Sequence, residues 1–181
     1  MLLVCKAQAG TIFDFESNTV PTSTTFTDTV GSLIATFAGP ATVCASGGLF
    51  ASLTGNVLIQ SFCAPNNVGP LTISFNSNIT SLSLDFATSG GPASLSLAAF
   101  ENGTPVGTNN SVSSDPLGYF DGEGVASFTG LFNSVTLTSS DFIAIDNVSV
   151  SAVPEPASTG MLLAALALLS ALVWNRRLAV R

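Results

Sequence analysis

Carboxylates are the side chains that the central part of this chain offers most plainly for chemistry. The 181 residues include 11 Asp and Glu, four Lys and Arg, and no His. The four bases lie near the ends, at Lys6, Arg176, Arg177 and Arg181, so residues 10–153 carry ten acids, no base and a formal charge of −10. This region therefore cannot build a His-activated nucleophile, a Lys Schiff base or a zinc site with imidazole ligands. Its charge also predicts no nucleic-acid partner.

One acidic group lies in a Gly-rich stretch and comprises Asp115, Asp121 and Glu123, with Tyr119 between them. A pair of carboxylates such as Asp121 and Glu123 is what a glycosidase uses. Acids beside Gly are also typical of turns. We favour the turn interpretation, rank glycan hydrolysis last among the functions considered, and expect the protein not to be an enzyme.

A second acidic position, Asp146, interrupts an apolar alternation. Ile143 and Ile145 share one parity, whereas Val148 and Val150 have the other. Either a β-bulge absorbs this slip, or Asp146 points inward. A buried carboxylate needs a cation or several hydrogen-bond donors. Because no Lys or Arg is near in the sequence, a bound Ca²⁺ with oxygen ligands is one way to meet that need.

The segment 142–150, Phe-x-x-Ile-Asp-Asn-Val-x-Val, resembles the last strand of extracellular jelly rolls, including many carbohydrate-binding modules. That resemblance implies a structural Ca²⁺ that ties the last strand to the first, with Asp14 and Glu16 joining Asp146 as ligands. The alternative stays open that these acids lie on the solvent face of a strand and that Asp146 and Asn147 only form a turn.

The elements that would position these acids are strands. No stretch between Thr11 and Ser151 has a sustained helical period, while period-2 alternation recurs between Gly, Pro, Asn and Asp. Leu82, Leu84 and Phe86, for example, fall on one face. Strands are expected at 11–15, 33–37, 57–62, 71–75, 79–86, 94–100, 125–128, 135–138 and 142–150. The pattern predicts an all-β fold, a two-sheet β-sandwich of jelly-roll type.

The strongest turn signal in this region is Asn102-Gly103. Both central residues of a type I′ turn need a positive φ, which Asn and Gly adopt most readily. We therefore expect a two-residue hairpin loop at this position.

The carboxyl end contains an apolar segment long enough to cross a bilayer. Residues 157–174 have no charge and would span about 27 Å as a helix. The predicted membrane-anchor residues are Met161, Leu162, Leu163, Leu166, Leu168, Leu169, Leu172, Val173 and Trp174. By the positive-inside rule, Arg176, Arg177 and Arg181 would keep the chain end in the cytoplasm. The sequence thus predicts one C-terminal transmembrane helix in the inner membrane, with the acidic domain outside.

Pro154, Glu155 and Pro156 precede this helix, and the arginines follow it. Pro-Glu-Pro, an apolar helix and an Arg-rich end within 30 residues of the stop resemble the PEP-CTERM sorting signal of exopolysaccharide-producing Gram-negative bacteria. The resemblance implies that an exosortase, a membrane-embedded cysteine protease, reads this motif and cleaves near it. Two prolines also favour an extended segment that a protease can grip.

Three segments follow from these features. Residues 1–9 end in Ala-Gln-Ala and are interpreted as the remnant of a truncated signal peptide, with the true start upstream. Residues 10–152 form the sandwich, and residues 153–181 the sorting signal. Of the three cysteines, Cys5 would leave with the signal, so Cys44 and Cys63 are expected to form a disulfide. Metal binding by two thiols is the weaker alternative.

Because the sequence predicts export, we consider functions at the cell surface or outside the cell. The first hypothesis is a non-enzymatic cell-surface or matrix protein retained among extracellular polysaccharides after sorting. The second is a carbohydrate-binding module, which usually stacks sugars on exposed aromatic rings. Tyr119 is the only Tyr, and the only Trp lies in the predicted membrane helix. The usual aromatic platform is therefore poor.

Overall fold

The computed structural model describes residues 10–20, 24–60, 68–115 and 122–153. These residues form ten strands and no helix. The strands are β1 (Thr11–Phe13), β2 (Thr25–Val30), β3 (Leu33–Ala38), β4 (Thr42–Ala45), β5 (Asn56–Ile59), β6 (Leu71–Thr88), β7 (Ser94–Glu101), β8 (Thr104–Val112), β9 (Gly122–Ser139) and β10 (Ile143–Ala152). The predicted all-β class is confirmed for this part of the chain. The predicted membrane helix, 157–174, lies outside it, and no described segment is a helix able to span a bilayer.

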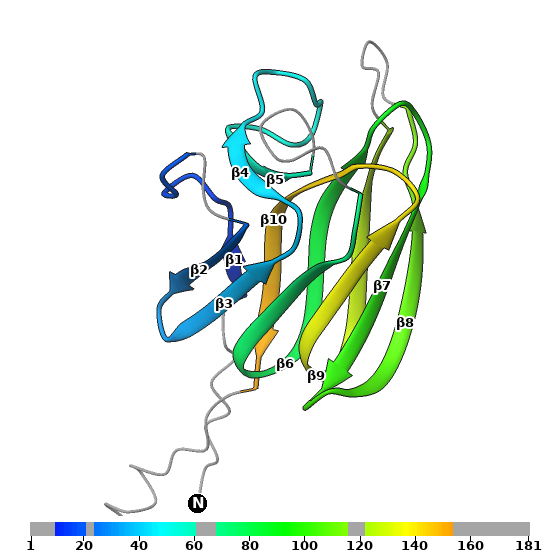
Figure 1. Ribbon diagram of the computed structural model, residues 1–181. Coiled ribbons are helices and arrows are strands. Elements are labelled where there is room, and N and C mark those ends of the chain that lie inside the picture. The colour runs from blue at the N-terminus through cyan, green and yellow to red at the C-terminus, as the bar shows by residue number, and fades with distance from the viewer. Residues whose placement is uncertain (1–9, 21–23, 61–67, 116–121, 154–181) are drawn as a thin grey trace, which may run out of the picture.

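The strands form two layers joined by two long strands (Figure 1). In the first sheet the order is β2-β3-β6-β9-β7-β8, using the first half of β6 and the second half of β9. The second sheet has the order β4-β5-β10-β6-β9, using the other halves, with β1 also paired to β10. All pairs are antiparallel. β6 and β9 therefore pass from one sheet into the other.

The bend in this pair of long strands corrects the strand prediction. β6 was expected as two strands, 71–75 and 79–86, and β9 as 125–128 and 135–138. Each pair is one continuous strand, because register shifts between Ser74 and Ile79, and between Ile79 and Ser81, absorb the change of direction. A bulge turns a strand without ending it. The alternation is indeed interrupted between the predicted strands, but the interruption marks a bend in one strand and not its end.

Other strand predictions need smaller corrections. β1 ends at Phe13 rather than at residue 15, because Phe15 has a left-handed φ of 61°. Strands β2, β4 and β8 were not expected. In β8 nearly every side chain is exposed, so its composition shows no alternation to detect. The turn at Asn102 and Gly103 is confirmed, with φ values of 50° and 81° between the paired residues Glu101 and Thr104.

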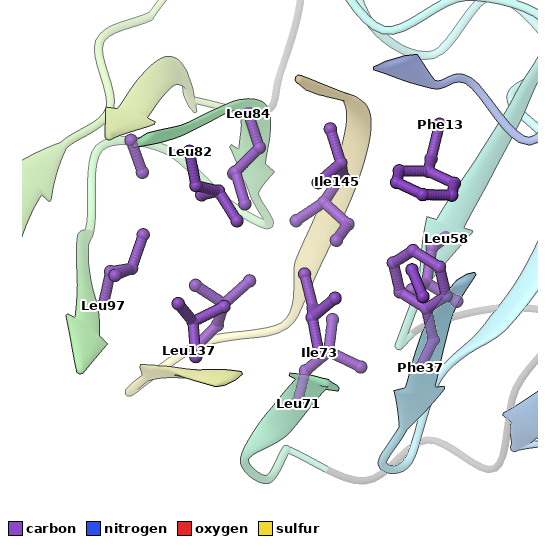
Figure 2. Close-up of a cluster of buried hydrophobic side chains, with 14 of the residues drawn as sticks. Phe13, Phe37, Leu58, Leu71, Ile73, Leu82, Leu84, Leu97, Leu137 and Ile145 are labelled. Carbon is purple, nitrogen blue, oxygen red and sulfur yellow. The ribbon is translucent and has the colours of Figure 1, made fainter. Parts of the chain in front are cut away.

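The main core lies between the two sheets. Leu82, Leu84 and Phe86 face it as predicted, opposite Leu71 and Ile73 of the first half of the same strand. Figure 2 shows Leu82, Leu84, Leu71 and Ile73 together with Ile145, Phe13 and Phe37, which come from other strands. A second, smaller cluster lies on the opposite face of the second sheet. Its members are Cys44, Phe50, Leu53, Val57, Ile59, Ala87 and Ala144.

The segment between β4 and β5, residues 46–55, covers this second cluster and is called here the cover loop. Phe50 and Leu53 are its buried apolar side chains, whereas Leu49 is 47% exposed. The outer face of the second sheet is thus partly a buried surface. Three of the acids singled out in the sequence, Glu16, Glu123 and Asp146, contact this loop or the residue directly after it.

Candidate functional site

The slip in β10 is a β-bulge, so the first of the two alternatives for Asp146 is correct. The register shifts between Asp146 and Ser149, and Asn147 has a left-handed φ of 51°. Asp146 consequently has the parity of Ala144 and faces away from the main core. It is nevertheless only 2% exposed. The residue is buried because the cover loop lies over this face of the sheet.

Two backbone amides meet the Asp146 carboxylate. Its Oδ2 accepts a hydrogen bond from the Thr54 N–H at 3.3 Å, and its Oδ1 accepts one from the Asn147 N–H at 2.7 Å. Burial nevertheless raises the pKa of Asp146 to about 6, because desolvation disfavours the charged carboxylate more than the two amides favour it, and repulsion by Glu16 and Asp85 adds to the shift. Asp146 therefore lies in an excess of negative charge.

The two repelling carboxylates are also held by hydrogen bonds. Glu16 Oε1 accepts from the Asn56 N–H at 3.0 Å, and Asp85 Oδ2 accepts from the Asn147 side chain at 2.9 Å. Glu16 packs against Gly55 so closely that a Cβ at Gly55 would overlap its carboxylate. A side chain at that position would displace Glu16. The loop after β1, the end of the cover loop and the bulge of β10 thus meet at one point.

The predicted calcium ligands are only partly brought together. Glu16 lies within electrostatic range of Asp146. Asp14 is exposed, and its Oδ1 accepts from the Glu16 N–H at 3.2 Å. Among the described residues, no group of three or more Asp, Glu, Cys or His side chains is placed to hold a metal ion. Sequence reasoning missed Asp85, which shares a register position with Asp146 on neighbouring strands.

Glu123 requires a larger correction, because the turn interpretation of this acid is wrong. It lies in β9, is only 8% exposed and reaches the cover loop. Its two oxygens accept from the Ala51 N–H at 2.5 Å and the Ser52 N–H at 2.7 Å, and from the Ser52 hydroxyl. The carboxylate is thus fully engaged in holding the loop, as no simple sequence signal had indicated. Asp121, its suggested partner, lies outside the described residues.

These contacts show what the acidic side chains do in the fold. Glu123 binds backbone N–H groups in the middle of the cover loop, and Asp146 and Glu16 bind N–H groups at its C-terminal end. Charge-assisted hydrogen bonds of this kind are stronger than neutral ones. In a region without Lys or Arg, backbone amides take the place of cations. The arrangement stabilises the cover loop on the sheet.

The remaining predicted site residues lie at or beyond the limits of the described chain. Cys44 is disulfide-bonded, but Cys63 lies in the segment 61–67, so the predicted pairing stays a prediction. Pro154, Glu155 and Pro156, the membrane-anchor residues and the terminal arginines also lie outside the described part. The last described contact before them is a hydrogen bond of 2.9 Å from the Val153 N–H to the Asn78 carbonyl.

Comparisons with known proteins address both parts of the chain. No curated protein is significantly similar to it. A solved structure described as "Binding sub-site dissection of a family 6 carbohydrate-binding module by X-ray crystallography and isothermal titration calorimetry" is 18% identical, covers 79% of this chain and 94% of its own, and has a TM-score of 0.37. A likeness of that size says nothing about what this sandwich binds.

The family comparison is specific and falls on the carboxyl end. Residues 152–177 match the family model PEP_exosort_dom, described as the PEP-CTERM protein-sorting motif. The match begins at the last residue of β10 and includes Pro154, Glu155 and Pro156, on which the resemblance was first recognised. The chain therefore carries a PEP-CTERM protein-sorting motif directly after its β-sandwich.

Proposed function

We propose that this protein is a non-enzymatic cell-surface or matrix protein that an exosortase cleaves near Pro154-Glu155-Pro156. The observation that carries the proposal is the sorting motif at 152–177, placed where the last strand ends. In this proposal the segment 157–174 anchors the precursor in the inner membrane. Cleavage then leaves the acidic sandwich at the cell surface or in the surrounding polysaccharide.

The experiment compares the full chain in an exosortase-bearing host and in the same host without the enzyme. Mass spectrometry of the recovered protein reports whether residues 153–181 remain attached. We expect loss of the C-terminal peptides only where the exosortase is present. Glu155→Gln in the motif should prevent that loss, whereas the matched change Glu101→Gln at the end of β7 should not. A tail that stays attached in both hosts would show that the motif serves only as an anchor.

One feature of the structure favours a non-enzymatic sandwich. Glu123, the described member of the suggested catalytic pair, already accepts hydrogen bonds from Ala51 and Ser52. A catalytic acid or base needs access to substrate. Release of reducing sugar from any polysaccharide by the purified chain, lost on Glu123→Gln with the fold intact, would contradict this part of the proposal.

Calcium binding by Asp14, Glu16 and Asp146 stays part of the proposal as a structural role. Its support is the mutual repulsion of Glu16, Asp85 and Asp146, which a cation would relieve. Binding would require side chains to move, since the described carboxylates now bind backbone amides. Adding Ca²⁺ to EDTA-treated protein should raise its melting temperature by mass action. An unchanged melting temperature would rule calcium out.

A further inference from the structure

The outer face of the first sheet carries uncharged side chains in rows, most of them Thr or Ser, with Ala38 and Ala98 beside Thr72 and Thr136. Backbone pairing aligns Thr27, Thr36, Ser74, Ser134 and Phe100 across β2, β3, β6, β9 and β7. The next row contains Thr72 and Thr136, whose hydroxyl oxygens are 3.3 Å apart. The neighbours of these residues along each strand, such as Ala35, Ile73 and Val135, point into the core. This outward surface is called here the hydroxyl face.

No charged side chain interrupts the hydroxyl face. The outward positions of β2, β3 and β7, of β6 from 71 to 75, and of β9 from 134 to 139 hold no Asp or Glu. Asp28, on β2, pairs with Ala35 and has the opposite parity. By contrast Asp85, Glu123 and Asp146 all lie on the outer face of the second sheet. In a domain of ten acids and no base, one broad face is free of charge.

The face is rigid and offers both donors and acceptors. A hydroxyl can donate and accept, as can the hydroxyls of a sugar. Threonine is β-branched and has few side-chain conformations, so little entropy is lost when its hydroxyl is engaged. Neighbouring strands lie about 4.8 Å apart, so the five strands of the first row extend over roughly 19 Å. A ligand that matches this face is extended and contacts several strands.

Phe100 adds an aromatic side chain at the end of the first row. Its parity in β7 is opposite to that of Leu95, Leu97 and Ala99, which are buried. It is half-buried and does not belong to the main core cluster. A flat ring beside hydroxyl groups is the combination on which sugar rings stack in binding sites. Sequence reasoning had placed Phe100 in a strand without recognising that it faces outward.

We propose that the hydroxyl face binds an extended, uncharged polysaccharide. The inference rests on the proposed function as an exported surface protein and names the class of polymer that this protein would contact. An anionic polymer would be repelled by the formal charge of −10, and a cationic one would find no carboxylate on this face. A neutral polysaccharide exchanges hydrogen bonds with water for hydrogen bonds with the rows and loses no charge solvation.

The test is affinity electrophoresis of the full chain in nonionic detergent, in native gels containing a neutral glucan, mannan or galactan, or the anionic polymer alginate. We expect at least one neutral polymer, and not alginate, to retard the protein. Thr36→Arg with Ser134→Arg should weaken binding roughly tenfold or more, through lost hydrogen bonds and steric obstruction. The matched control, Ser81→Arg with Ser151→Arg, makes the same chemical change on the paired outward positions of the second sheet. It should leave binding unchanged.

A second variant guards against misfolding. Phe100→Ala should weaken retardation, and Phe100→Tyr should retain it, with melting temperatures compared for all proteins. The proposal is overturned if no neutral polymer retards the chain, if alginate retards it equally, or if the control variant loses binding as the hydroxyl-face variant does. Self-association that concentration alone produces, and that the hydroxyl-face variant abolishes, would assign the face to a second copy instead. None of these results affects tail cleavage, so the proposed sorting is tested separately.

Discussion

The outer faces of the two sheets differ in their acidic side chains, in a domain that has no Lys or Arg to pair with them. On the second sheet, acids lie at or under the border of the cover loop and are satisfied by backbone amides. On the outer face of the first sheet, acids are absent and Thr and Ser hydroxyl groups are arranged in rows. Carboxylates, which are costly to bury, thus occur where they hold the cover loop by hydrogen bonds. Thr and Ser, whose hydroxyl groups water solvates readily, occur on the sheet face that no loop covers in the described part of the chain.

This difference follows from what a carboxylate needs. Without Lys or Arg between residues 7 and 175, an Asp or Glu near the protein surface has only water, amides and hydroxyls as partners. Glu123 obtains three such donors from two residues of the cover loop. A buried carboxylate with several donors is a stable anchor, whereas one with fewer donors and negative neighbours, as at Asp146, keeps a raised pKa. The two carboxylates under one loop therefore differ in the number of hydrogen-bond donors that they receive.

The largest expected effect concerns the apolar part of the cover loop. Leu53 is fully buried, and Leu53→Ala should lower the free energy of unfolding by about 2–5 kcal/mol, because it removes transfer energy and leaves a cavity. Leu49→Ala, in the same loop but at an exposed position, should change it by less than about 0.5 kcal/mol. Urea denaturation of both variants provides the measurement. Equal effects would mean that the loop does not form part of the core.

The next effect concerns the anchor. Glu123→Gln replaces one acceptor oxygen by an NH₂ group that faces amide donors, so we expect a loss of about 1.5–3 kcal/mol in the free energy of unfolding. Glu101→Gln makes the same chemical change at the end of β7 and should cost less than about 0.5 kcal/mol. Hydrogen exchange gives the local readout.

In the Glu123→Gln protein, the amides of Ala51 and Ser52 should exchange faster, while those of Val135 and Leu137 in the other sheet change little. If the amides of both sheets were affected alike, the carboxylate would be stabilising the whole sandwich and not the cover loop. The comparison between the two faces would then lose its basis.

A smaller effect depends on pH. The pKa of Asp146 is raised from 3.8 to about 6 in the fold, so the folded state takes up its proton first as the pH falls. The ionised Asp146 carboxylate lowers the free energy of unfolding above about pH 6, and this loss is relieved as the pH falls towards 4. In metal-free buffer, lowering the pH from 7 to 5 should add about 1 kcal/mol through this group.

Asp146→Asn removes the titration and serves as the reference. When the pH falls from 7 to 5, the free energy of unfolding of the wild type should gain about 1 kcal/mol relative to that of this variant. Chemical denaturation at both pH values measures this difference, and contributions from acids that do not interact with Asp146 cancel in it. A variant with the same pH dependence as the wild type would show that Asp146 is not a strained carboxylate.

Local pattern allowed much of the first sheet and the main core to be predicted from sequence. Alternation at 82–86 gave the inward face of β6, and Asn102-Gly103 gave the hairpin, because both signals lie within a few residues. The bulge at Asn147 was visible as a change of parity. Each of these features is fixed by neighbours in the chain.

The candidate site was predicted less well because its contacts are distant in sequence. Glu123 binds Ser52 and Ala51, which lie 71 and 72 positions earlier in the sequence. Asp85 binds Asn147, which lies 62 positions later. Neither is signalled by local composition. The hydroxyl face was likewise hidden, since its rows cross five strands and exist only in the register of their pairing. Topology, and not motif, creates both outer faces.

The smallest expected effect tests whether the hydroxyl face serves the fold at all. Thr72 and Thr136 are directly opposed, with their hydroxyls 3.3 Å apart on a half-buried surface. Cross-strand pairs of this kind contribute about 0.2–1 kcal/mol. A double-mutant cycle with Thr72→Ala and Thr136→Ala should therefore give a coupling energy within that range, well below the loss expected at Glu123. A coupling above about 2 kcal/mol would mean that the rows are maintained for stability. A small coupling leaves the outward hydroxyls free to be used for binding, because replacing them changes affinity without changing the sandwich that presents them.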